Sequence, residues 1–201
     1  MPSTIPPPPP PSDWNKCQTT HGTPIDDTFV AFKMPITGTD WDIPDVLEAF
    51  PDLNLVITLE TINETDMNYY QIDQFKDQNV EHISCWMKPG KIPEEWFVER
   101  FFNVIDEILE TNPNALIGVH DVNGINRTGY MICRYLIEKR GWNPQNAIDA
   151  FENARGEKME KTGKYHKCIQ DLLNRKSLSA LWLVQCAYYC FLVGKYIPKF
   201  D

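Results

Sequence analysis

Ten residues between an apolar strand and a helix constrain this chain more than any other segment. Residues 116–119 are a short apolar run that predicts a buried strand, and residues 128–140 predict a helix. The segment between them, 120–129, has to turn sharply, and such a turn points successive backbone N–H groups at one place beside the positive end of the helix. Gly124 gives the turn backbone freedom, and the planar fork of Arg127 can hold two oxygens. The segment therefore predicts an anion-binding loop at the carboxyl end of a strand.

Position 121 is the one residue of this loop that does not suit phosphate chemistry. A Cys there would complete the His-Cys-x5-Arg-Thr pattern of cysteine-dependent phosphatases, in which a thiolate attacks phosphorus, but the residue is Asp121. A carboxylate is a poor nucleophile and repels phosphate oxygens by about 4 kcal/mol per charge pair at ~4 Å and an effective dielectric constant of ~20. We therefore expect no catalytic residue at position 121 and weak phosphate binding. We also infer that Asp121 itself accepts the loop N–H groups and Arg127.

The expected phosphate-type loop comprises nine residues. His120 is expected to orient it from behind, and the Thr128 hydroxyl is expected next to position 121. Its members are His120, Asp121, Val122, Asn123, Gly124, Ile125, Asn126, Arg127 and Thr128.

Strands come first in the chain and helices follow in series. Apolar and β-branched runs predict strands at 29–32, 53–59, 80–86 and 116–119. Helices are expected from Pro93 to Asn112, over 128–140, from Pro144 to Gly156 and over 165–173. This order predicts an α/β sheet domain whose functional loop lies at a strand's carboxyl end.

Length and composition favour one domain with appended tails. The chain has 201 residues, 42% of them hydrophobic, which suits a single core over residues 12–175. Residues 1–11 are rich in proline and are expected to form an extended tail. Residues 176–201 are expected to form an apolar C-terminal helix or tail. Six scattered cysteines with no metal-ligand spacing predict reduced thiols, an intracellular location and no structural metal.

Charge is distributed unevenly. The net charge is −9, yet residues 155–176 hold seven basic residues against three acids. A solvated helix face is favoured there over a binding patch. The basic residues are Arg155, Lys158, Lys161, Lys164, Lys167, Arg175 and Lys176.

The sequence resembles the RNA 5'-triphosphatase branch of the dual-specificity phosphatases, which includes the triphosphatase domain of mRNA capping enzymes, the RNA-complex-interacting phosphatases and the baculovirus phosphatase. The resemblance rests on residues 118–120 and 124–137, with further matches at 29–35, 144–156 and 165–173. It implies a mostly parallel sheet flanked by helices and a cysteinyl mechanism without metal or cofactor. By position, Asp121 replaces the nucleophile. A downstream Glu-Arg pair is Glu160-Lys161 here, which makes Lys161 an auxiliary candidate.

Three functions stay open from the sequence. The favoured one is an inactive pseudophosphatase acting as a binding or scaffold module, with RNA 5' ends or a protein complex that handles them as partner, in the cytoplasm or nucleus. The second is an active phosphatase on RNA or phosphoprotein, with Glu94 and Glu95 as candidate acids. An aspartyl-phosphate mechanism would need Mg²⁺ and further carboxylates. The third is an adaptor tethered to a membrane through residues 177–194, which carry no charge over 18 residues, the lower limit for a span. Gln185, two serines and two tyrosines dilute this segment, so a buried or partner-binding helix is slightly favoured over an anchor.

Overall fold

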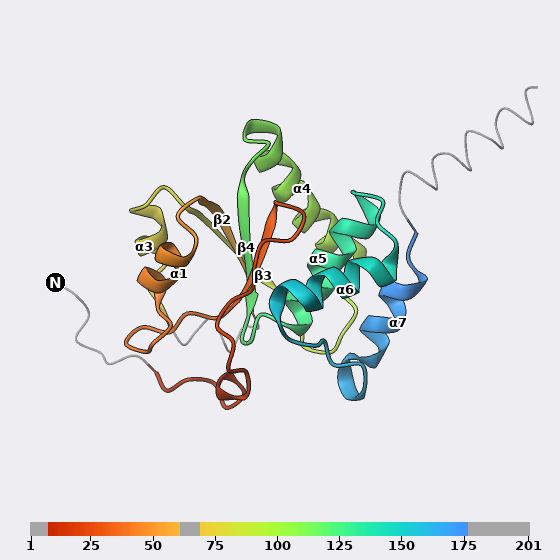
Figure 1. The fold of residues 1–201 in the computed structure, drawn as a ribbon, viewed down its shortest axis with the longest axis horizontal. Helices are drawn as coiled ribbons and strands as arrows, with labels where there is room; N and C mark the ends of the chain where they lie inside the picture. Colours follow the sequence, from red (N-terminus) through yellow and green to blue (C-terminus); the bar gives the residue numbers. More distant parts are fainter. Residues whose placement is uncertain (1–7, 61–68, 177–201) are drawn as a thin grey trace, which may run out of the picture.

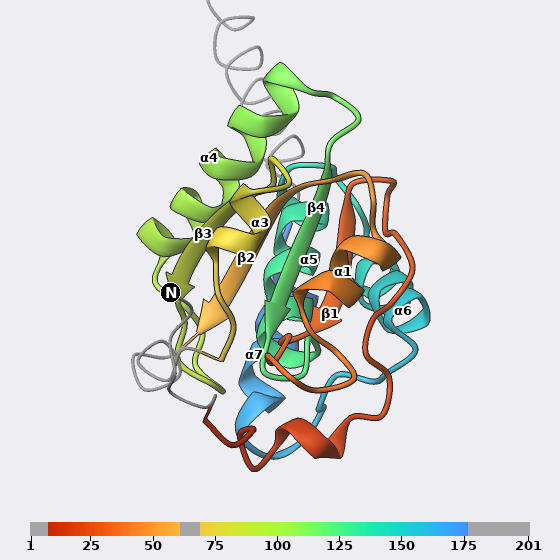
Figure 2. The same ribbon diagram turned by 90° about the vertical axis from the view of Figure 1, so that its left-hand side faces the viewer.

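Four parallel strands form the centre of the protein in its computed structural model, which describes residues 8–60 and 69–176. The strands are β1 (Phe29–Lys33), β2 (Leu53–Glu60), β3 (Glu81–Trp86) and β4 (Leu116–Asp121). They lie side by side in the order β1-β4-β2-β3 (Figure 2). All four predicted strands are confirmed, and β4 is a central strand whose carboxyl end carries the predicted loop.

Helices cover both faces of the sheet, which confirms the predicted α/β class. Figure 1 shows α1 and α3 on one side of the sheet and α4 to α7 on the other. The four predicted helices are present. The helix predicted to begin at Thr128 begins at Asn126. Their bounds are α4 (Glu95–Thr111), α5 (Asn126–Glu138), α6 (Pro144–Arg155) and α7 (His166–Asn174).

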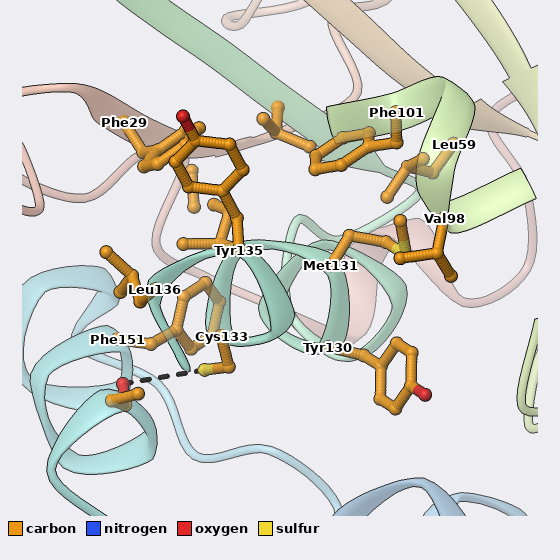
Figure 3. Packing of buried hydrophobic residues seen from close by; sticks show 14 of the residues in the cluster. Phe29, Leu59, Val98, Phe101, Tyr130, Met131, Cys133, Tyr135, Leu136 and Phe151 are labelled. Atoms are coloured by element: carbon orange, nitrogen blue, oxygen red, sulfur yellow. Dashed lines mark hydrogen bonds between the residues drawn. The ribbon is translucent and has the colours of Figure 1, made fainter. Parts of the chain in front are cut away.

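Helix α5 is the centre of the larger core. Each of its residues from Arg127 to Glu138 is buried. Met131 and Tyr135 pack against side chains from α4 and the sheet, whereas Cys133 faces α6, where its thiol contacts the carbonyl oxygen of Ala147 at 3.4 Å (Figure 3). A helix surrounded by protein on all sides is fixed in position, and it holds the loop at its own N-terminus equally firmly.

The smaller core lies on the opposite face of the sheet, under two helices that the sequence did not predict. These are α1 (Ile43–Ala49) and α3 (Asp73–Lys76). Helix α1 starts with a capping box, in which the Asp42 side chain accepts from Ile43 N–H and Asp45 accepts from the backbone of Asp42. With seven and four residues, both helices are too short to show a 3.6-residue apolar period. Two single 3₁₀ turns, η1 (Trp14–Lys16) and η2 (Gly163–Tyr165), complete the described elements.

The two ends of the chain differ in how far they are described. Pro11 accepts a hydrogen bond from Trp14 N–H, so the end of the proline run contacts the domain. Residues 177–194, the candidate membrane segment, lie outside the described residues. Among residues 8–60 and 69–176, no helix combines the length and the apolar character needed to cross a membrane.

Candidate functional site

The loop after β4 is held in a tight turn against the neighbouring strand. Gly124 has φ of +62°, and a Cβ at this position would lie 1.9 Å from the carbonyl oxygen of Phe32 in β1. Only glycine fits there, because the backbone is left-handed and the neighbouring backbone leaves no room for a side chain. The turn brings the N–H groups of residues 123, 124, 125 and 127 around the side chain of Asp121.

The carboxylate of Asp121 occupies the centre of the loop and is 4% exposed. Its Oδ1 accepts from Gly124 N–H at 2.6 Å, from Asn123 N–H at 3.0 Å and from Ile125 N–H at 3.4 Å. Its Oδ2 accepts from Arg127 N–H at 2.8 Å and lies 3.6 Å from Arg127 Nε. Asp121 therefore accepts the N–H groups and pairs with the guanidinium that an external oxyanion would need, as inferred from the sequence.

A second arginine, Arg155 at the end of α6, supports the loop from its outer side. Its side chain is fully buried and donates to the carbonyl oxygens of Gly124 at 3.0 Å and Asn123 at 2.9 Å. The same guanidinium donates to the carbonyl oxygen of Thr19 at 2.8 Å. The sequence assigned Arg155 to a solvated basic face, which is wrong for this residue, because its charge is used inside the protein to bind loop carbonyls.

A cavity of about 400 Å³ opens above Asp121. Four segments far apart in the chain meet there: the N-terminal segment, the connection after β3, the loop and the stretch before α7. The lining residues are Pro11, Ser12, Asp13, Lys16, Pro89, Asp121, Val122, Asn123, Asn126, Arg127, Glu160, Lys164 and Tyr165. Cations and carboxylates are mixed in this set, so the cavity is not a purely basic pocket.

The N-terminal segment is fixed over the loop by a buried tryptophan. Trp14 Nε1 donates to the carbonyl oxygen of Met34 at 2.8 Å, and Lys33 Nζ lies 3.5 Å from the centre of the Trp14 ring. Asn123 of the loop donates from Nδ2 to the carbonyl oxygen of Asp13 at 3.1 Å. The segment after the proline run is thus part of the cavity wall.

Several candidate residues from the sequence make contacts other than the predicted ones. Lys161 lies 3.6 Å from the buried carboxylate of Glu152, and the basic residue of this stretch that lines the cavity is Lys164 instead. The Thr128 hydroxyl is buried and has no hydrogen-bond partner among the described residues. Glu95, a candidate acid, pairs with Arg134 and Arg175, whose hydrogen bonds and charges lower its pKa.

His120 lies behind the loop in a compact polar cluster. Its Nε2 is 2.9 Å from the Thr58 hydroxyl and 3.1 Å from the Tyr70 hydroxyl, and both hydroxyls also contact Nε2 of His82. Burial lowers the pKa of His120 to about 3 and that of His82 to about 4. Both imidazoles are therefore neutral at physiological pH, and His120 connects the loop to β2 and β3.

No cysteine takes over the role of the missing nucleophile in the described part of the cavity. The described cysteines, Cys17, Cys85, Cys133 and Cys168, are buried, and none lines the cavity. Burial raises the pKa of each of these thiols. Such thiols are poor nucleophiles, because the thiolate is the reactive form.

Comparison with known proteins gives a consistent result. Residues 47–172 match the catalytic domain of dual specificity phosphatases. The probable tyrosine-protein phosphatase pir-2 of Caenorhabditis elegans is 36% identical over 80% of this chain, which spans 49% of that protein's length. The tyrosine-protein phosphatase of Autographa californica nuclear polyhedrosis virus is 33% identical, with 74% of this chain and 89% of the viral protein covered.

Two further comparisons concern RNA-related relatives and the fold. The RNA/RNP complex-1-interacting phosphatase of Bos taurus is 31% identical, with 73% of this chain and 46% of that protein covered. Among solved structures, Tk-PTP in its active form superposes with a TM-score of 0.60 at 19% identity, covering 77% of this chain and 97% of that one. Human tyrosine phosphatase-like serine/threonine/tyrosine-interacting protein superposes with a TM-score of 0.58 at 15% identity, covering 83% and 99%.

Proposed function

This chain belongs to the dual-specificity phosphatase family, and we propose that it is a member without phosphatase activity that acts as a binding or scaffold module. One observation carries the proposal. The carboxylate of Asp121 stands in the loop and accepts the N–H groups of Asn123, Gly124 and Arg127. A substrate phosphate would have to displace this buried carboxylate before it could reach the same donors.

The chemistry of the residue supports the same conclusion. Cysteine-dependent hydrolysis needs a polarisable thiolate that the loop stabilises, and a carboxylate in that place adds a negative charge instead. Aspartyl-phosphate chemistry would need a divalent cation beside Asp121. In residues 8–60 and 69–176 no group of three or more His, Cys, Asp and Glu side chains is placed to hold one.

We place the binding role at the cavity above the loop. The ligand that fits the family resemblance is the 5' end of an RNA, or a protein of a complex that handles such ends, in line with the name of the mammalian relatives. Lys16 and Lys164 at the cavity wall would meet its phosphates, above the position that Asp121 occupies. Binding at the wall leaves the ligand intact, which is what a scaffold requires.

The activity test compares the natural protein with Asp121→Cys on an aryl phosphate and on γ-labelled 5'-triphosphate RNA. Asp40→Cys is the matched control, because it adds a thiol at an exposed position that does not line the cavity. We expect background rates and no phosphoryl adduct on Asp121 for the natural protein and for Asp40→Cys. Natural-protein turnover at the rate of an active Asp121→Cys variant, or a phosphoryl group trapped on Asp121, would contradict the proposal.

The binding test uses fluorescence anisotropy at fixed salt with 5'-triphosphate RNA and the same RNA carrying a 5'-hydroxyl. We expect tighter binding of the triphosphate and a loss of that preference in the double variant Lys16→Ala, Lys164→Ala. Lys167→Ala is the control, since Lys167 is exposed but does not line the cavity. Equal affinity for both RNAs would contradict the RNA 5' end as the ligand, and a protein of an RNA-handling complex would then be the proposed partner.

A further inference from the structure

The N-terminal segment brings its own charges to the wall of the cavity. We call residues 11–16 the strap. Figures 1 and 2 show it, in red, at the end of the molecule where β4 stops. The contacts of Trp14 and Asn123 described above hold the strap against the loop. The strap residues that line the cavity are Pro11, Ser12, Asp13 and Lys16.

The charges that line the cavity balance one another in number. Asp121 and Arg127 form a pair within the loop. The other two cations of the lining are the lysines that we expect to meet the ligand phosphates, so the groups that neutralise them decide how well they bind an anion. The lining cations are Lys16, Arg127 and Lys164, and the lining carboxylates are Asp13, Asp121 and Glu160.

Asp13 is the carboxylate that acts on both lysines. Its Oδ1 accepts a hydrogen bond from Lys16 Nζ, three residues along the strap. This hydrogen bond lowers the pKa of Asp13, and the charges of Lys16 and Lys164 lower it further. Asp13 and Lys164 come from opposite ends of the chain, and the cavity brings them within electrostatic reach of each other.

The two carboxylates that neutralise cavity cations differ in how firmly they are held. Asp121 is 4% exposed and accepts from four backbone N–H groups. The side chain of Asp13 is 51% exposed and that of Lys16 is 72% exposed. An exposed ion pair is weak, because water screens it and both side chains lose freedom when they form it. A phosphate can therefore displace Asp13 from the lysines much more easily than it can displace Asp121.

We propose that the strap is a built-in competitor of the ligand, in which the Asp13 carboxylate neutralises Lys16 and Lys164 until a phosphate chain displaces it. This inference rests on the proposed function, because it concerns the same cavity, and it names the group that limits the affinity there. The anchored strap keeps Asp13 at the cavity, so the competition is present in every molecule and needs no second ligand.

The first experiment uses Asp13→Asn, which keeps the size of the side chain and removes its charge. The probes are inorganic tripolyphosphate, measured by calorimetry, and the 5'-triphosphate RNA, measured by anisotropy. We expect the variant to bind both about fivefold more tightly than the natural protein. The slope of log K against log salt for the RNA should become steeper by about 0.7 for each lysine that is freed. Unchanged affinity for tripolyphosphate, or no binding to either protein, would overturn the proposal.

Two other carboxylates provide matched controls. Asp73 pairs with Lys76 at 3.1 Å with the same spacing in the chain, and both side chains are exposed, but neither lines the cavity. Glu160 does line the cavity, but no lysine of the described chain forms an ion pair with it. We expect no gain in Asp73→Asn and less than half of the Asp13→Asn gain in Glu160→Gln. Equal gains in Asp13→Asn and Glu160→Gln would overturn the proposal, because they would show a general effect of charge.

The last measurement places Asp13→Asn in the Lys16→Ala, Lys164→Ala background. We expect the gain in affinity to disappear there, because Asp13 acts through the lysines that it neutralises. A gain that persists without the lysines would overturn the proposal. Failure of the proposed RNA role has a different signature. In that case all proteins would bind 5'-triphosphate and 5'-hydroxyl RNA equally, and the tripolyphosphate comparison would still decide whether Asp13 competes.

Discussion

The backbone N–H of Gly124 donates to Oδ1 of Asp121 at 2.6 Å, the shortest of the contacts that link the loop to its own side chain. The loop is therefore closed by an acceptor from within the protein. These donors are satisfied within the folded protein, so we expect the loop to contribute to stability instead of to ligand affinity. This relationship makes stability, and its response to added anions, the most direct measure of the site.

Replacing Asp121 with alanine should destabilise the protein and create an anion site. The variant leaves buried N–H donors without their charged acceptor, and each hydrogen bond to a charged group is worth about 1.5–3 kcal/mol. We expect a loss of at least about 2 kcal/mol in the free energy of unfolding, measured by urea denaturation. Added phosphate should restore about 2.7 kcal/mol at 100 times its dissociation constant.

The control for that experiment is Asp42→Ala, which removes the side-chain cap of α1. It should cost about 1 kcal/mol, and phosphate should not restore it. If phosphate stabilises the natural protein as much as Asp121→Ala, the carboxylate does not compete with anions and the proposed closure of the loop is wrong.

Arg155→Met should be among the most damaging single changes outside the loop. The variant fills the same volume but leaves the carbonyl oxygens of Asn123, Gly124 and Thr19 without the buried guanidinium. We expect a loss of about 3 kcal/mol or more in the free energy of unfolding. Arg140→Met is the comparison, because Arg140 is 41% exposed at its side chain and its ion pair with Asp26 spans 3.7 Å. That variant should lose less than about 1 kcal/mol, and similar losses for both arginines would contradict the supporting role of Arg155.

The strands and the loop could be predicted from the sequence because both are encoded locally. β4 and the loop are contiguous in the chain. The apolar run that forms the strand, the glycine that allows the turn and Arg127 all lie within about twelve residues of one another, so a local pattern reveals them. Helices α1 and α3 were not predicted, because their stability comes from packing on the smaller core and, for α1, from a cap at Asp42. Short helices without a visible period depend on tertiary contacts that a single sequence does not display.

The rest of the site could not be predicted because it is assembled from distant segments. Lys16, Lys164 and Arg155 come from three parts of the chain, and nothing in their local patterns distinguishes them from surface residues. The prediction for Arg155 was wrong for this reason. Its neighbours Lys158 and Lys161 are exposed, so the same basic run contains both exposed and buried residues, and the sequence does not distinguish them. Position 121 was different, since its expected contacts lay within the loop itself.

Gly124→Ala should disrupt the loop far more than an equivalent change elsewhere. A Cβ at Gly124 would overlap the Phe32 backbone, and φ of +62° is unfavourable for alanine by about 1–2 kcal/mol. Gly156→Ala is the matched control, because Gly156 has φ of +74° and nothing within 4 Å of its added Cβ. We expect the control to lose only the conformational 1–2 kcal/mol and Gly124→Ala to lose several kcal/mol more by urea denaturation. Equal losses would show that the close approach of Phe32 relaxes without cost.

Stability should fall as the pH decreases below about 6.5, because of the polar cluster behind the loop. In the unfolded chain His82 and His120 take up protons near that pH, whereas in the folded protein their pKa values are about 4 and about 3. The folded protein holds both imidazoles neutral, whereas the unfolded chain protonates them on acidification. The unfolded state therefore gains protons that the folded state does not, and the free energy of unfolding falls as the pH drops below the unfolded pKa. Each histidine should contribute a slope approaching 1.4 kcal/mol per pH unit between about pH 6 and 5. Urea denaturation at several pH values measures this slope, and His82→Gln should reduce it by about half. A slope that His82→Gln leaves unchanged would show that other groups, such as the partly exposed His21, whose pKa burial also lowers, are responsible.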